Sequence, residues 1–174
     1  LVHIALDTGM TRIGFSDTPE SAEEVRKIKE IPGLKIEGIF THFARADEYD
    51  KSPALVQLSR YQHFVQLLKD QGVEIPLCHC SNSAGIVEDL DSNHMDMVRA
   101  GICIYGLYPS DEVDRSRIRL TPVMEIKSFI TYIKEIGPKT PVSYGSTFVS
   151  DKTMRVATIP TGYGSVYGRC DGYP

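Results

Sequence analysis

The chain has 174 residues, of which 41% are hydrophobic and 24% charged, and its formal net charge is -4. This composition is typical of a soluble globular protein that is long enough to bury a sizeable core. The acidic balance argues against broad attraction to nucleic acid or to an anionic membrane, so any anion site must be local. No apolar run is long enough to span a bilayer.

The chain starts in a strand-like segment, residues 1–7, without an initiator methionine or a basic leader. This start predicts a fragment or a processed chain, with no visible signal peptide. The few cysteines favour a reducing compartment over a disulfide scaffold. They are Cys78, Cys80, Cys103 and Cys170.

Strand and helix patterns alternate through the first two thirds of the chain. Helices are expected to begin at Thr18–Pro19 and Ser52–Pro53, where cap and first-turn proline favour a start, and a short one at Asn82 or Ser83. Gly72 is expected to end the second helix. Such alternation predicts parallel strand pairing. The expected strands are residues 2–6, 35–40, 76–80 and 97–104.

Strand patterns without intervening helices follow Pro109. They cover residues 123–136, 142–148 and 154–159, and they predict a β-rich region. We expect a boundary near residue 112, which gives a first part at 1–112 and a second part at 113–174.

Polar residues follow each expected strand of the first part, at 7–12, 41–47, 82–83 and 99–102. Four such units are too few for a closed barrel, which needs about eight strands. In a barrel, the carboxyl ends of the strands form the active-site face. We therefore expect an α/β fold: the second half of a (β/α)8 barrel followed by the start of a β-rich domain.

Arg99 is the most informative candidate, because an arginine in an apolar strand needs a partner when it is buried. Gly101 and Ile102 follow it, with backbone N–H groups free to face an anion, and Ser83 precedes a short helix whose amides suit phosphate. The segment indicates an anion or cofactor site. An ion pair with a core carboxylate is the alternative for Arg99, and simple helix capping is the alternative for Asn82 and Ser83.

Three further side chains are candidates for chemistry. Arg12, after a glycine-containing turn, is suited to a carboxylate or to a surface ion pair. His42 is suited to acid–base work or to a structural role. Tyr144 is suited to carrying a proton or to strand packing. The Cys78–His79–Cys80 run lacks paired zinc spacing, so no metal site is expected.

Six segments occur in the order and spacing of one known family. They are DTGMTRIG at 7–14, THFA at 41–44 with Asp47, NSA at 82–84, VRAGI at 98–102, VSYG at 142–145 and GY at 162–163. Together they resemble alanine racemase, the pyridoxal-phosphate (PLP) enzyme that interconverts L- and D-alanine. The resemblance implies an eight-stranded barrel followed by a β domain, a head-to-tail homodimer, a cytoplasmic location and D-alanine supply for cell-wall precursors.

The resemblance also implies residue roles. Arg99 would contact the pyridine nitrogen, which stays neutral because arginine stays protonated. Ser83, Gly101 and Ile102 would hold the phosphate beside Asn82. Arg12 would bind near the PLP phenolic oxygen and the substrate carboxylate. His42 would lie near the ring and couple to Arg99 or to the catalytic tyrosine. Tyr144 would act as a base on the partner's site, and Asp47 and Tyr163 would line the substrate entrance.

This sequence departs from the family pattern in three places. The lysine segment that carries PLP is absent, and with it one of the two bases. Ala5 stands where many relatives have a modified lysine that braces the arginine, so a bound anion would have to hold Arg12. Residues 164–170 separate Gly162–Tyr163 from a later Asp-Gly-Tyr.

We therefore expect a segment of an alanine racemase that does not racemise alanine by itself. One alternative is a non-catalytic PLP or phosphate binder. Another is a different PLP-dependent racemase or decarboxylase of the same barrel class. A half barrel exposes strand edges and apolar faces, so we also expect self-association of the chain.

Overall fold

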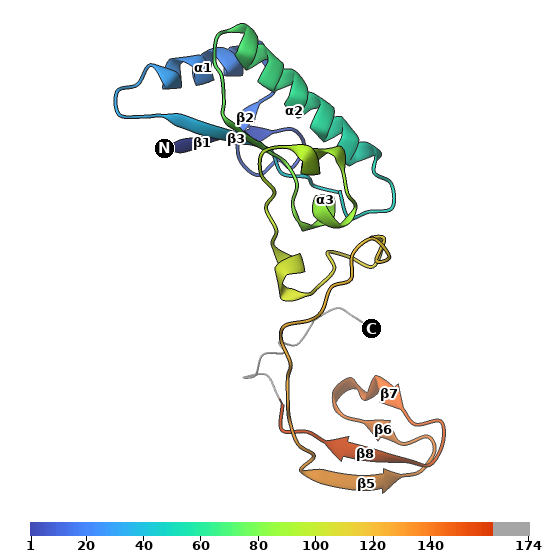
Figure 1. Cartoon of the computed structure of the whole chain (residues 1–174). Coiled ribbons are helices and arrows are strands. Elements are labelled where there is room, and N and C mark those ends of the chain that lie inside the picture. The colour runs from blue at the N-terminus through green and yellow to red at the C-terminus, as the bar shows by residue number, and fades with distance from the viewer. Residues whose placement is uncertain (162–174) are drawn as a thin grey trace. The chain divides into compact units, whose positions relative to one another are not determined.

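The structure is a computed structural model that describes residues 1–161. It separates into two compact units, Leu1–Met124 and a second that begins at Glu125 (Figure 1). The boundary expected near residue 112 lies within the first unit and stays a prediction. The expected departure at residues 164–170 lies outside the described residues, as does Tyr163.

A parallel four-stranded sheet forms the centre of the first unit, in the order β2-β1-β3-β4. Every neighbouring pair is parallel, which confirms the prediction from the strand–helix alternation. Three of the expected strands are present, and the two-residue strand β2 was not predicted. The bounds are Val2–Asp7 for β1, Phe15–Ser16 for β2, Ile36–Phe40 for β3 and Leu77–His79 for β4.

The helices begin where local signals predict. Helix α1 spans Pro19–Lys29, and the side chain of Thr18 accepts a hydrogen bond from the backbone N–H of Ser21 at 3.3 Å. Helix α2 spans Ser52–Asp70, and Gly72 follows it with a φ of 75°. The short α3, Ser83–Val87, is capped by Asn82, which accepts from Gly85 N–H at 3.0 Å.

The core lies between the sheet and the two long helices, which share one face of the sheet (Figure 1). Strand residues Ile4, Leu6 and Ile39 pack there against the helices. Helix α2 contributes Phe64 and Leu68, both fully buried. This packing aligns the carboxyl ends of β1, β3 and β4 along one edge, because neighbouring parallel strands end together.

The strand expected at residues 97–104 is wrong. Residues 97–101 form no ladder, and Ile102–Tyr105 is a 3-10 helix that ends at Gly106 with a φ of 76°. The carboxylate of Asp96 takes the Cys78 N–H at 2.8 Å, a donor that a next parallel strand would need. Arg99 N–H donates to Ser81 O at 2.9 Å, but this contact alone makes no ladder, and Arg99 lies in a segment without regular secondary structure.

The second unit is β-rich in its described part, as expected. Strands β5 (Tyr132–Ile136) and β8 (Met154–Thr158) pair antiparallel, and β6 (Pro141–Val142) pairs with β7 (Phe148–Val149). The continuous strand predicted at 142–148 is wrong, because the 3-10 helix Tyr144–Ser146 interrupts it. Positive φ values reverse the chain there. Among residues 1–161, no helix combines the length and the apolar character needed to cross a membrane.

Candidate functional site

The candidate site is an open pocket of about 380 Å³ in the first unit, at the edge where the parallel strands end. This volume falls in the range of small-molecule sites, about 300–1,000 Å³. Its walls come from the segments after β1, β3 and β4 and from the segment after Arg99. The lining residues include the predicted His42, Asp47, Asn82, Ser83, Arg99, Gly101 and Ile102. The structure therefore brings seven predicted residues to one pocket.

Backbone carbonyls hold the guanidinium of Arg99 in place. Its Nη2 donates to Thr41 O at 2.7 Å and to Cys80 O at 3.1 Å, and its Nη1 donates to His79 O at 3.2 Å. The carbon of the guanidinium lies 5.2 Å from the centroid of the Phe40 ring, within range of a cation–π contact. These partners lie at the ends of β3 and β4, so the sheet itself positions the cation.

The other strong partner of Arg99 is an imidazole. Nη1 of Arg99 lies 2.6 Å from Nδ1 of His79, and Nε2 of His79 lies 2.8 Å from Nδ1 of His3. His79 is 3% exposed, and burial, with the charge of Arg99 second, lowers its pKa to about 4. His79 is thus a neutral acceptor near pH 7. From the sequence alone, His79 was considered only as part of a possible zinc site.

Arg99 carries an uncompensated charge. Within residues 1–161, its hydrogen-bond acceptors are carbonyls and imidazoles, and none is a carboxylate. Burial lowers its pKa, and the charge of Arg12 acts in the same direction. The alternative of an ion pair with a core carboxylate therefore has no support in the described residues. A half-buried cation of this kind is suited to an external anion or to a lone pair on a ligand.

Ser83 forms the second polar wall. Its Oγ accepts hydrogen bonds from the backbone N–H groups of Gly101 at 2.9 Å and Cys103 at 3.3 Å. Both lone pairs are then used, so the hydroxyl hydrogen is left to donate, and it has no acceptor among residues 1–161. A Cβ added at Gly101 would meet one atom within 4 Å, Ser83 Oγ at 3.4 Å, so the space beside this backbone is open.

Asn82 links α3 to the loop that follows β3. Its Nδ2 donates to Phe43 O at 3.2 Å and lies 3.5 Å from Nε2 of His42, while its Oδ1 caps α3. Capping is therefore its observed contact, together with this loop. His42 also lies 3.4 Å from Nη2 of Arg99, and burial, then Arg99, then Arg12 lower its pKa. A neutral imidazole consequently faces the pocket.

Arg12 belongs to an exposed loop beside the pocket. Asp7 shapes the loop by accepting the N–H groups of Gly9 and Thr11, each at 3.0 Å. Arg12 itself is exposed and does not line the pocket, and the neighbouring Met10 does. The charge of Arg12 nevertheless lowers the pKa of His42, which places its influence at the site.

Sequence patterns missed Gln57, a buried polar residue of α2. Its Nε2 donates to Thr8 Oγ1 at 3.2 Å and to His42 O at 3.1 Å, and its Oε1 accepts from Ala44 N–H at 2.9 Å. Gln57 thereby joins the loops after β1 and β3. The signal that could have found it is a glutamine on the buried face of α2, in register with the apolar positions Ala54, Leu58 and Tyr61.

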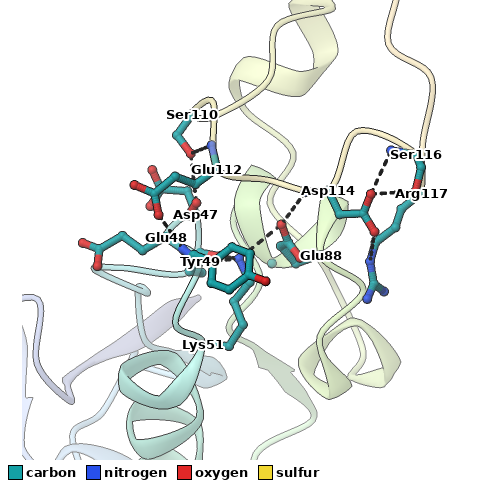
Figure 2. A network of polar contacts seen from close by, with 12 residues as sticks. Asp47, Glu48, Tyr49, Lys51, Glu88, Ser110, Glu112, Asp114, Ser116 and Arg117 are labelled. Atoms are coloured by element: carbon teal, nitrogen blue, oxygen red, sulfur yellow. Dashed lines mark hydrogen bonds and ion pairs between the residues drawn. The ribbon is translucent and has the colours of Figure 1, made fainter.

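The loop that carries Asp47 is tied to the chain after Pro109 (Figure 2). The hydroxyl of Ser110 donates to Asp47 O at 2.9 Å, and Tyr49 N–H donates to Glu112 at 2.6 Å. Below these contacts, Lys51 pairs with the buried Glu88 at 3.1 Å. The predicted entrance residue Asp47 therefore lies in a braced loop at the pocket wall.

Tyr144 lies in the second unit, 84% exposed and in a 3-10 helix, so strand packing is not its role. Tyr163 lies outside the described residues. In the part of the chain that the structure describes, no three His, Cys, Asp or Glu side chains gather as metal ligands.

Two family models match this chain. The alanine racemase N-terminal domain matches residues 1–109, and the alanine racemase C-terminal domain matches residues 123–173. Alanine racemases from Methanococcus maripaludis and Desulforamulus reducens are each 43% identical, over 97% and 99% of this chain. In both cases the match covers 45% of the relative, so the chain spans under half the length of these proteins.

Solved structures agree with the family models. A Clostridium difficile 630 alanine racemase has a TM-score of 0.78 and 42% identity, covering 92% of this chain and 42% of that one. The crystal structure of alanine racemase from E. faecalis has a TM-score of 0.75 and 35% identity, with the same coverage. The order of the matched segments, the parallel sheet and the β-rich second unit lead to one conclusion: this chain belongs to the alanine racemase family.

Proposed function

We propose that this chain is part of a PLP-dependent alanine racemase, to which it contributes the second half of a (β/α)8 barrel and the start of the β-rich domain. The observation that carries the proposal is the convergence of Arg99, Ser83 and His42 on one pocket. Its similarity to alanine racemases at 42–43% identity supports the choice of substrate.

The pocket residues fit PLP. The hydroxyl hydrogen of Ser83 and the space beside Gly101 suit a phosphate. The Gly101 N–H, expected from the sequence to face an anion, donates to Ser83 Oγ instead, so it would act on a phosphate through that hydroxyl. Arg99 offers a fixed N–H donor and no proton acceptor, so it would bind a neutral pyridine nitrogen. When bound, PLP supplies electron withdrawal from the amino acid's α-carbon.

The chain's own residues would bind and orient the cofactor and the amino-acid substrate. Arg99 would keep the pyridine nitrogen neutral, and the resulting weak electron withdrawal would favour return of a proton to the α-carbon over side reactions. Arg12 would attract the substrate carboxylate, and Asp47 and Tyr163 would line the entrance. Tyr144 would move the α-proton in the partner's site, within a homodimer. Cytoplasmic D-alanine supply for the cell wall is the corresponding role.

The isolated chain should bind PLP without racemising alanine, because the family's PLP-carrying lysine segment is absent from these residues. The test is incubation of residues 1–174 with PLP and L-alanine, followed by chiral amino-acid analysis. We expect PLP binding in the micromolar to millimolar range and no D-alanine. Robust turnover would contradict the proposal for this chain, whereas loss of binding in Arg99→Met and Ser83→Ala would support the assigned site.

Non-catalytic binding is the second candidate, favoured by the same pocket without the lysine. Borohydride reduction followed by intact-mass measurement separates the two. A PLP-sized adduct on one specific lysine would argue against simple binding. Serine and lysine, tested as substrates of the longest available form of the protein, probe the remaining alternatives among PLP enzymes.

Self-association is expected because the sheet has open edges at β2 and β4. Light scattering of the full chain at rising concentration measures it directly. A monomer at high concentration would contradict this part of the proposal.

A further inference from the structure

Two side chains beyond the pocket extend the contact between Arg99 and His79. Nε2 of His79 lies 2.8 Å from Nδ1 of His3 on β1. Nε2 of His3 in turn lies 3.3 Å from a carboxylate oxygen of Glu37 on β3. A continuous line of polar contacts thus runs from a guanidinium at the pocket to an anion behind it, across three neighbouring strands.

The direction of every hydrogen bond in this line follows from the guanidinium of Arg99 at its pocket end. A guanidinium only donates, so Nδ1 of His79 must accept and its hydrogen must sit on Nε2. That hydrogen is donated to Nδ1 of His3, whose own hydrogen must then sit on Nε2. The last bond goes to Glu37, which accepts as a carboxylate. The chemistry of the two ends therefore leaves one tautomer for each neutral imidazole.

The surrounding strands are shaped around these two rings. A Cβ added at Gly38 would lie 2.6 Å from the His3 ring, so a side chain there would displace the imidazole. The His79 ring stacks on Phe40, with centroids 5.3 Å apart and an angle of 14° between planes. Position and tilt of the rings are thus set by packing as well as by hydrogen bonds.

We propose that His3 and Glu37 are positioning residues that form the remote end of a hydrogen-bond relay and orient Arg99 toward the ligand. The inference rests on the proposed function, because it takes the ligand of Arg99 to be the PLP ring. A carboxylate in direct contact would occupy the guanidinium fork and neutralise it. With two imidazoles between the charges, the anion supports the cation. The contacts of Arg99 within residues 1–161 use Nη1 and Nη2, so its Nε–H stays available to a ligand.

The first test is histidine side-chain ¹⁵N NMR of the full chain without PLP. We expect His79 and His3 both to carry hydrogen on Nε2. His3→Phe keeps a ring but removes the acceptor, so the Nε2 signal of His79 should shift. Exposed His63 gives a matched control, and His63→Phe should leave that signal unchanged. Hydrogen on Nδ1 of His79, or an unmoved signal in His3→Phe, would overturn the relay.

The second test is PLP affinity, measured by titration. Loss of one hydrogen bond in a charged network weakens binding by about tenfold, which is the expected effect of His3→Phe. The milder Glu37→Gln keeps the shape and removes the charge, so it should act in the same direction by about threefold. Its control is Glu74→Gln at an exposed position of the first unit. Equal affinities in Glu37→Gln and Glu74→Gln would count against the relay.

The two proposals fail differently. If the proposed function is wrong, the parent chain and all variants fail to bind PLP, while NMR still finds the expected tautomers and the His3→Phe shift. If the relay is wrong, PLP binds the parent and His3→Phe equally well, and the His79 signal does not respond. Circular dichroism of each variant checks that the fold is retained.

Discussion

Acidification should destabilise this protein through His79. Burial, Arg99 and His3 together lower the pKa of this imidazole from 6.5 to about 4. An unfolded chain would therefore bind a proton at His79 in a pH range where the folded chain does not. Since stability falls wherever the unfolded state binds more protons, the free energy of unfolding should decrease as the pH drops through this range.

The size of the effect follows from the two pKa values. The contribution of His79 is fully present above pH 6.5 and is lost progressively down to about pH 4. One proton corresponds to about 1.4 kcal/mol per pH unit, so the loss amounts to about 3 kcal/mol. That is a large share of the stability of an ordinary domain, about 5–15 kcal/mol.

The assay is urea unfolding at several pH values, for the parent and for His79→Gln. The lowered pKa of His42 adds a loss of the same sign in both proteins, so it cancels in the difference. The parent should lose more stability than the variant between pH 6.5 and about pH 4. Equal slopes for the two proteins would refute the reasoning, as would an NMR titration that puts the His79 pKa near 6.5.

Three other changes should lower stability, each measured by urea unfolding at neutral pH. Gly14→Ala places a Cβ 2.7 Å from Asp7 N at a φ of +130°, so we expect a loss of about 2 kcal/mol or more; an equal stability would contradict this close approach. Lys51→Met leaves the buried Glu88 without its cation at a cost of about 2 kcal/mol, which Glu88→Gln in the same chain should partly restore. Phe64→Ala empties part of the core at a cost of about 3–5 kcal/mol, and a loss under about 1 kcal/mol would place Phe64 outside the core.

Local sequence signals were sufficient for the helices of the first unit. Thr18 and Pro19 begin α1, and Asn82 caps α3, because a capping side chain and the backbone N–H that donates to it lie within three residues of each other. The ordered family motifs likewise identified seven residues that line the pocket. Their separate positions along the chain are joined by parallel pairing, which the strand–helix alternation already indicates.

Local sequence signals could not predict contacts between segments that are distant along the chain. Whether residues 97–104 form a strand depended on Asp96, whose side chain takes the Cys78 N–H that a ladder would use. Gln57 binds the loops after β1 and β3, which come near it only in the folded chain. A polar side chain does not count in a pattern of apolar residues, so the helical pattern did not single it out.

The sequence by itself determined the family, the helix starts, the parallel pairing and the set of polar residues at the strand ends. Tertiary structure alone decided the partners of Arg99. They are the carbonyls at the ends of β3 and β4 and the imidazole of His79, which in turn contacts His3. The physical reason is separation along the chain: His3 and His79 lie 76 residues apart. Only the pairing of β1 and β4 with the strand between them, β3, brings their rings to hydrogen-bonding distance.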